Sequence, residues 1–372
     1  LYEYIGKKSA LELMEYVDKI NLAFGGEGTK LYSTAGSSLK TRCMQNGLHL
    51  LDASVRHLGT DINYIVLEHL YDHLKEKIDF HFNCFIDKVE KLDSGYRIYH
   101  EDSYYDGREC VISAGRSGSK WMENVCQDLG INTNSNRVDI GVRVELPAGI
   151  FAHLTDELYE SKIVYRTSKY EDLVRTFCMN PKGEVVNENT NGIVTVNGHS
   201  YEDPAKQTNN TNFALLVSKK FTEPFKEPIA YGQHIASLAN MLAGGILVQR
   251  FGDLLEGRRS TPDRIKSSII TPTLSCATPG DLSLVIPYRQ MKSIIEMLFA
   301  LDKIAPGTAS RYTLLYGIEV KFYSARVKLT NELETEGVKN LFTIGDGAGV
   351  TRGLIQASAS GVYVAQTICA RG

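Results

Sequence analysis

The chain has 372 residues, 43% of them hydrophobic and 23% charged, and it carries a formal net charge of −3 with a pI of about 6.4. These values are typical of a globular protein that is long enough for two lobes. They give no electrostatic reason to expect a nucleic acid or an anionic membrane as a partner. The longest apolar stretch, at residues 235–248, is too short and too interrupted to span a bilayer.

Seven cysteines, at positions 43, 84, 110, 126, 178, 276 and 369, form no Cys-x-x-Cys pair. Their odd count and their spacing argue against a disulfide framework and against a zinc site, so no metal is predicted. The N-terminus lacks a secretion signal, and we therefore expect a cytoplasmic protein. Because the first residue is Leu1 instead of Met, we also expect that a segment upstream has been removed.

The first predicted helix covers residues 9–24, where Leu11, Met14, Val17 and Ile20 recur at helical spacing. The glycines at 25, 26 and 28 follow a helix instead of a strand, so they predict a helix end and not a dinucleotide fingerprint. A second helix is expected over residues 61–77. Short strands are then predicted at 80–84, 85–92, 96–100 and 109–114, the last of which ends at Gly115.

From Val138 onward the pattern changes to β-rich segments with polar connections, followed by helices. A strand at 312–322 then leads into the C-terminal part of the chain. The predicted fold class is α/β with an inserted α+β lobe. We expect residues 1–136 and 312–372 to form one lobe and residues 137–311 to form a domain inserted into it. The predicted strands of that domain are 138–145, 162–166, 173–179, 183–187, 192–196 and 213–217, and its predicted helices are 228–251, 262–270 and 288–304.

The stretch from Leu341 to Gly361 predicts a buried strand, a glycine-rich turn and a helix. Its alternating glycines free the backbone for close approach to a ligand. Thr351 is expected to cap the helix, whose first N–H groups would face that ligand. Asp346, at the carboxyl end of the strand, can accept hydrogen bonds from sugar hydroxyls. We interpret the stretch as a nucleotide-type site, and the alternative is an ordinary α/β crossover with a glycine turn.

The run Gly345-Asp-Gly-Ala-Gly-Val-Thr-Arg-Gly353, continued to Gly361, resembles the C-terminal flavin motif of two-dinucleotide-fold flavoproteins. Within these it is most similar to a group of bacterial and archaeal proteins described as uncharacterised FAD-dependent dehydrogenases. The resemblance extends along the chain, for example through 138–145, 175–181 and 314–323. It implies a Rossmann-like FAD/NAD(P)-binding domain with an inserted β-rich substrate domain. It also implies FAD as the cofactor, hydride transfer to or from a small organic substrate, and NAD(P)H as a candidate electron donor.

The resemblance further implies which residues would hold FAD. Asp346 would contact the flavin ribitol, and replacing it with Ala is expected to weaken FAD binding without unfolding the protein. In such proteins the turn at Gly115 passes near the dinucleotide, although the segment before it fits a plain buried strand equally well. The implied cofactor-binding residues are Gly115, Gly345, Asp346, Gly347, Gly349, Val350, Thr351, Arg352 and Gly353.

The chain departs from the family pattern in one respect. Such proteins begin with a strand, a Gly-x-Gly-x-x-Gly turn and a helix that hold the FAD pyrophosphate, and this chain has no such element. The predicted FAD-binding domain is therefore incomplete, without its first βαβ unit. Two hypotheses follow. The chain is either a fragment of an FAD-dependent oxidoreductase, or a non-catalytic remnant or ligand-binding module that cannot hold FAD. The sequence identifies neither the substrate nor the oligomeric state.

Four residues are predicted to be catalytic. Cys178 is either a redox thiol beside the flavin or a small apolar filler in a strand. His199, placed in a turn, is either a proton donor or a turn histidine that hydrogen-bonds to its own loop. Lys321 and Tyr323 fall on one face of a predicted strand. They either line one pocket, where the positive charge of the lysine would raise the reduction potential of the flavin, or both face solvent.

Three arginines are predicted to bind the substrate. Arg175 lies on a predicted strand. Arg258 and Arg259 precede a predicted helix start, which would make an anion site for a carboxylate or a phosphate. The alternative for this pair is a structural ion-pair cluster with Asp253, Glu256 or Asp263.

Overall fold

The computed structural model describes residues 1–134, 136–190, 192–201, 203–221 and 227–372. The chain forms two compact units. Unit 1 consists of Leu1–Gly28, Tyr64–Asn136 and Tyr323–Gly372, and unit 2 consists of Thr29–Asn63 and Arg137–Phe322. The division differs from the predicted boundaries, because residues 29–63 and the strand predicted at 312–322 both belong to unit 2.

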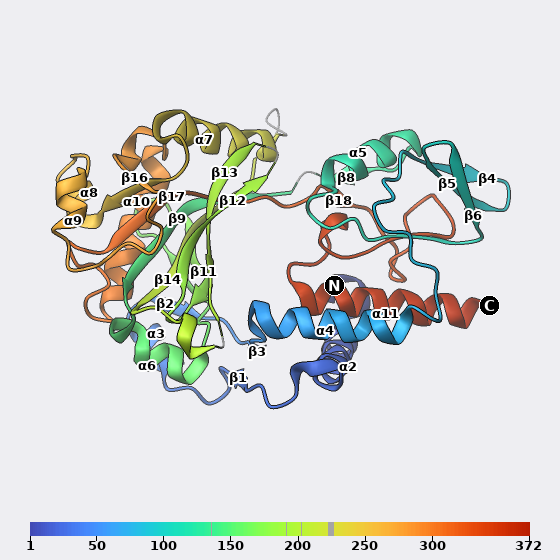
Figure 1. Cartoon of the computed structure of the whole chain (residues 1–372), viewed down its shortest axis with the longest axis horizontal. Coiled ribbons are helices and arrows are strands. Elements are labelled where there is room, and N and C mark those ends of the chain that lie inside the picture. The colour runs from blue at the N-terminus through green and yellow to red at the C-terminus, as the bar shows by residue number, and fades with distance from the viewer. Residues whose placement is uncertain (135, 191, 202, 222–226) are drawn as a thin grey trace. The chain divides into compact units, whose positions relative to one another are not determined.

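Unit 2 is built on a mixed sheet of eight strands, which confirms the mixed α/β class (Figure 1). In spatial order the strands are β16 (Thr278–Pro279), β15 (Leu247–Arg250), β17 (Leu314–Lys321), β9 (Val138–Pro147), β14 (Asn210–Lys219), β11 (Leu173–Asn180), β10 (Ile163–Arg166) and β2 (Leu48–Leu50). Among the described residues of this sheet, β15 and β16 pair in parallel and the other neighbours are antiparallel. Residues 29–63 join this unit because Leu50 pairs with Ile163 across β2 and β10.

One face of this sheet packs on helices and forms the main apolar core. On β9 the apolar residues alternate, so Ile140, Val142 and Val144 all point into that core. Helix α10 (Tyr288–Asp302) contributes Met291, Ile294, Met297, Leu298 and Leu301, which confirms its predicted inward stripe. The other helices of unit 2 are α3 (Leu39–Gln45), α6 (Ala148–Leu158), α7 (Pro228–Ala243), α8 (Phe251–Leu255) and α9 (Pro262–Lys266), with short 3₁₀ turns at Pro204–Lys206 and Leu282–Leu284.

The other face of the sheet is polar and is nevertheless buried. On β9 it consists of Asp139, Gly141, Arg143 and Glu145, and the three charged side chains are fully buried. A hairpin of β12 (Glu184–Thr190) and β13 (Ile193–His199) packs over it (Figure 1). Burial on both faces explains why nearly every residue of β9 is inaccessible to solvent. A separate pair, β1 (Leu31–Ser33) and β3 (Ser54–Arg56), completes unit 2.

Unit 1 holds a parallel strand pair, β7 (Cys110–Ile112) with β19 (Leu341–Thr343), and the long helix α11 (Leu354–Arg371). The segment 80–84 is not a strand as predicted, because Phe80 and Phe82 pack instead on Tyr71. The remaining elements of unit 1 are α1 (Tyr2–Ile5), α2 (Lys7–Asn21), the π-helical turn Leu22–Gly26, most of α4 (Gly59–Leu74), the meander β4 (Lys88–Leu92), β5 (Gly95–His100) and β6 (Ser103–Gly107), α5 (Ser119–Asp128), and the pair β8 (Thr133–Asn134) and β18 (Arg326–Val327).

Within the described ranges, none of the helices combines the length and the apolar character that crossing a membrane requires.

The fit of the hairpin over the polar face can be tested at Gly198. A Cβ atom there would lie 2.1 Å from Asn212 Oδ1 and 2.4 Å from Arg143 Nη1. We predict that Gly198→Ala lowers the free energy of unfolding by about 3 kcal/mol, because neither buried group has room to move. The matched control is Gly149→Ala in α6, where the space is open and a gain of about 0.5–1 kcal/mol is expected. Equal unfolding curves for the two variants, measured in urea, would contradict this packing.

Candidate functional site

The glycine-rich turn of unit 1 follows β19 and lies against the end of β7. Gly345 and Gly349 have φ angles of 71° and 69°, which favour glycine. The Gly345 N–H donates to the buried Ser360 hydroxyl on α11 at 3.1 Å. A Cβ on Gly347 would lie 2.7 Å from the carbonyl oxygen of Gly115. The structure therefore brings together the two turns that the sequence predicted to be near a dinucleotide.

Asp346 organises this turn. Its Oδ1 accepts the Thr351 hydroxyl proton at 2.7 Å and the Gly353 N–H at 3.3 Å. Its Oδ2 lies 3.7 Å from Arg116 Nε, and the side chain is 21% exposed. Thr351 is therefore not the helix cap that the sequence predicted. Gly353, with φ of 145°, occupies the N-cap of α11, because the Thr351 hydroxyl is committed to Asp346.

Arg352 and Tyr323, predicted separately, lie together in unit 1. The guanidinium carbon is 4.3 Å from the centroid of the tyrosine ring, which is a cation–π distance. Val350 contributes its carbonyl, which accepts from the Leu1 amine at 3.2 Å. Tyr323 is thus a buried ring beneath an arginine of the glycine-rich turn.

The backbone around this turn fits an anionic, sugar-bearing ligand. No heavy atom lies within 4 Å of where a Cβ would stand on Gly115 or Gly353. Helix α11 has 18 residues and begins without a side-chain cap. Its first N–H groups therefore keep their capacity to bind a ligand, with the positive end of the helix dipole behind them.

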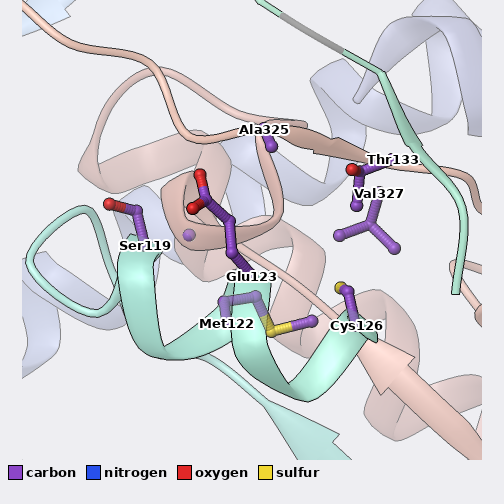
Figure 2. A pocket seen from close by; sticks show the side chains of 8 residues that line it. Ser119, Met122, Glu123, Cys126, Thr133, Ala325 and Val327 are labelled. Atoms are coloured by element: carbon purple, nitrogen blue, oxygen red, sulfur yellow. The ribbon is translucent and has the colours of Figure 1, made fainter. Parts of the chain in front are cut away.

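A small pocket lies behind the turn and is shown in Figure 2. Figure 2 shows Glu123, Met122 and Cys126 extending from α5 toward it. Its empty space of about 180 Å³ includes open solvent, and it has essentially no room for even one water molecule, so it is too small for a ligand site. We regard it as a packing gap next to Gly347 instead of the substrate site. It is lined by Ser119, Met122, Glu123, Cys126, Thr133, Ala325, Val327 and Gly347.

In unit 2 the polar face of the sheet centres on a buried ion pair. Arg143 donates to Glu319 twice, from Nε to Oε2 at 2.8 Å and from Nη2 to Oε1 at 2.7 Å, and both side chains are fully buried. Lys321 Nζ lies 3.0 Å from Glu319 Oε1. Burial alone would raise the pKa of the Glu319 carboxyl, but the charges of Arg143 and Lys321 lower it below its usual value. Lys321 is therefore a buried, paired cation at the end of β17.

Cys178 lies beside this pair. It has a φ of 46° where the pairing of β11 becomes irregular. Its carbonyl accepts from Arg143 Nη1 at 3.1 Å and from Asn180 Nδ2 at 2.9 Å, and its N–H donates to Glu160 Oε1 at 3.1 Å. The residue is half-buried among polar groups, in a strained backbone conformation that is characteristic of functional positions.

The remaining predicted residues of unit 2 lie elsewhere on it. Arg175 donates to the buried Asp139 at 2.5 Å. His199 is exposed, but it ends strand β13 opposite Glu184 and so is not in a turn as predicted. Arg258 and Arg259 are both exposed.

For Arg258 the structure shows the ion-pair alternative. Its Nε lies 2.9 Å from Asp253 Oδ1, and its Nη1 lies 2.7 Å from Glu256 Oε2. Asp253 also accepts from Arg250 and from the Ser260 hydroxyl. An arginine held by two carboxylates has less capacity for a substrate anion.

Sequence reasoning missed Arg143, Glu319 and Arg116 as site residues. The sequence did contain a signal for Arg143. Charged residues and a glycine occupy every second position from Asp139 to Glu145 in an otherwise apolar strand. Such alternation predicts a strand with one polar face. It does not reveal that this face is buried.

The role of Asp346 in the turn leads to a prediction that revises the expectation from sequence. We predict that Asp346→Ala lowers the free energy of unfolding of the ligand-free protein by about 1–3 kcal/mol, because Thr351, itself only 3% exposed, loses its acceptor. Thr351→Val should cost a similar amount, and the double variant should cost less than the sum. Wild-type melting of Asp346→Ala would show that the turn does not depend on this carboxylate.

Comparison with known proteins identifies the domain within unit 2. Residues 138–322, just under half of the chain, match a family model described as "FAD-dependent protein, C-terminal domain-like". A Clostridium beijerinckii protein described as uncharacterised is 28% identical over 342 residues. That alignment covers 85% of this chain and 62% of the relative, so the chain spans less than two thirds of the relative's length.

Two solved structures give weak matches. The structure of CtdE in complex with FAD is 9% identical, with 92% of this chain and 74% of that chain covered and a TM-score of 0.34. An HpxO variant of Klebsiella pneumoniae complexed with FAD is 12% identical, with 96% and 68% covered and a TM-score of 0.35. These scores are too low to assign a fold. The family match itself supports an FAD-dependent flavoprotein family and FAD as the cofactor.

Proposed function

We propose that this chain, whose residues 138–322 match a domain of FAD-dependent proteins, belongs to an FAD-dependent oxidoreductase. The enzyme would be a dehydrogenase or reductase that moves a hydride between the flavin and a small organic substrate, with NAD(P)H as a candidate electron donor. The match of unit 2 to that domain is the observation that carries this proposal. The geometry of the glycine-rich turn in unit 1 supports it independently.

The proposed FAD site consists of the turn and the start of α11. Asp346 Oδ1 is used within the turn, whereas Oδ2 still has capacity to accept hydrogen bonds from ribityl hydroxyls. Gly115 and Gly353 offer open backbone, and the α11 N-terminus offers N–H groups and a positive dipole end. Gly345, Gly347, Gly349, Val350, Thr351 and Arg352 complete the proposed set. We further propose that this lobe is a Rossmann-like domain without its first βαβ unit, interrupted by the substrate domain.

A bound flavin would supply the electron chemistry, and the protein's residues would bind and orient the substrate and hold protons. Lys321 remains a proposed catalytic residue, and its ammonium lies within a buried face, 3.0 Å from Glu319 Oε1. Cys178, His199 and Tyr323 remain proposed catalytic residues, and Arg175, Arg258 and Arg259 remain proposed substrate ligands. Arg258 is the weakest of these, because two carboxylates already bind it.

FAD binding provides the direct test. We predict that the protein quenches FAD fluorescence in a saturable titration, and that Asp346→Asn weakens binding about 10–100-fold through the loss of a charge-assisted hydrogen bond worth about 1.5–3 kcal/mol. The matched control is Glu334→Gln. That carboxylate also accepts a backbone N–H, from Asn340 at 2.6 Å, but its other partner is Arg371 and not the glycine-rich turn.

The outcomes separate the claims. A wild-type protein that takes up no FAD contradicts the proposed function and favours a remnant or a different ligand-binding module. If the protein binds FAD but Asp346→Asn and Glu334→Gln bind it equally well, the flavin is held elsewhere and Asp346 is a structural residue of the turn.

A further inference from the structure

Arg116 stands next to the glycine-rich turn of unit 1, and the proposed flavin site gives it no role. It lies in the short connection between β7 and α5. Two close approaches fix the backbone of this connection. A Cβ on Gly347 would lie 2.7 Å from the Gly115 carbonyl oxygen, and a Cβ on Gly118 would lie 2.6 Å from the Ala114 carbonyl oxygen. The side chain of Arg116 is nevertheless 58% exposed, so a rigid backbone presents an accessible guanidinium.

The guanidinium of Arg116 keeps most of its hydrogen-bonding capacity. Its Nε faces Asp346, 3.7 Å from Oδ2, which is too long for a direct hydrogen bond. Among the described residues, Asp346 is the only charged partner of this side chain. An exposed ion pair of this length contributes little to stability, so a ligand can readily replace it. The N–H groups of both terminal nitrogens are available to an anion.

The two other arginines that flank the turn are already engaged. The guanidinium carbon of Arg352 lies 4.3 Å from the centroid of the Tyr323 ring. Arg326, whose backbone lies against the turn, forms an ion pair with Glu3. Arg116 is therefore the arginine of this group that is best suited to bind an anionic ligand.

Asp346 indicates which kind of ligand would reach Arg116. Oδ1 accepts from the Thr351 hydroxyl and from the Gly353 N–H, so Oδ2 is the oxygen left for the hydroxyl groups of a ligand. Oδ2 is also the oxygen that Arg116 faces. A ligand that satisfies both residues carries hydroxyl groups and, close to them, an anion. A phosphorylated polyol has this chemistry, because a phosphate accepts two parallel N–H bonds from one guanidinium.

Charge leads to the same ligand. The Asp346 carboxylate alone would repel a phosphate brought to the turn, and the positive charge of Arg116 offsets that repulsion. A neutral polyol would gain nothing from this offset. The arginine should therefore discriminate between flavins that differ only in phosphorylation.

We propose that Arg116 is a specificity-determining residue of the flavin site, which binds the phosphate next to the ribityl chain while Asp346 Oδ2 accepts from ribityl hydroxyls. This inference rests on the proposed function, because the phosphate belongs to the flavin. It assigns recognition of the polyol and recognition of the phosphate to two different side chains.

The test compares riboflavin, FMN and FAD, which share the ribityl chain and differ in phosphorylation. Quenching of flavin fluorescence measures the affinity of each. For the wild type we expect FMN and FAD to bind at least about 10-fold more tightly than riboflavin. Arg116→Met should weaken FMN and FAD binding by about 10-fold or more and leave riboflavin binding within about 2-fold. Its melting temperature should match the wild type, because an exposed side chain with one weak contact is removed.

The matched control is Arg97→Met. Arg97 also belongs to unit 1 and also pairs with an aspartate, through Nε at 2.7 Å from Asp106 Oδ1, but it lies on the meander strand β5. This variant loses the same charge and should keep the wild-type affinities for all three flavins.

Salt dependence and a conservative variant give a second measurement. Wild-type affinity for FMN should fall as NaCl rises from about 0.05 M to about 0.5 M, because salt screens contacts between exposed charges. Arg116→Met should lose most of this dependence, whereas Arg116→Lys should retain it and recover part of the affinity.

The outcomes separate the inference from the proposed function. If Arg116→Met binds all three flavins as the wild type does, or weakens all three equally, Arg116 does not read the phosphate and the inference is overturned while the flavin function stands. The same holds if Arg97→Met reproduces the selective loss, because the effect then comes from net charge. If none of the flavins binds to the wild type, the proposed function fails and the inference fails with it.

Discussion

The buried pair of Arg143 and Glu319 is the interaction on which unit 2 depends. Removing two charges from water costs several kcal/mol per ion, which is recovered only if every donor and acceptor is paired. Arg143 meets this condition, because Nε and Nη2 bind Glu319, Nη2 also reaches Asn197, and Nη1 binds Asn212 and the Cys178 carbonyl. One guanidinium thereby joins β9, β17, β14, β11 and the covering hairpin.

Several local features follow from this constraint. Position 198 is glycine, because a side chain there would strike Arg143 and Asn212. Lys321 is held within the sheet because Glu319 Oε1, which accepts from Arg143 Nη2, also lies 3.0 Å from Lys321 Nζ. Asn180 extends the same hydrogen bonds to Ser200, so the ion pair belongs to a polar layer that continues to Ser200. Such layers fix side-chain positions best when every member is satisfied, and in this one the buried Asn212 Nδ2 lacks a partner.

Local patterns predicted much of this molecule. Strand β9, the inward stripe of α10 and the glycine-rich turn after β19 were all indicated by periodicity or by glycine spacing. Features that depend on distant partners were not predictable. Arg143 meets Glu319 across 176 positions, and residues 29–63 join unit 2 through the pairing of Leu50 with Ile163. The N-cap of α11 is Gly353 and not Thr351 as predicted, because the Thr351 hydroxyl donates to Asp346. The residue type at position 351 alone does not reveal this contact.

A double-mutant cycle on the ion pair tests this account most directly. Glu319→Leu should lower the free energy of unfolding by about 3–5 kcal/mol, because it leaves Arg143 and Lys321 as uncompensated buried cations. Arg143→Met should cost less, because Glu319 keeps Lys321 Nζ at 3.0 Å as a partner. The double variant leaves one buried cation instead of two, so it should lose no more stability than Glu319→Leu. Urea unfolding of the four proteins measures the coupling. Simple additivity of the two single effects would show that the charges are not paired in solution and would contradict the central role given to them here.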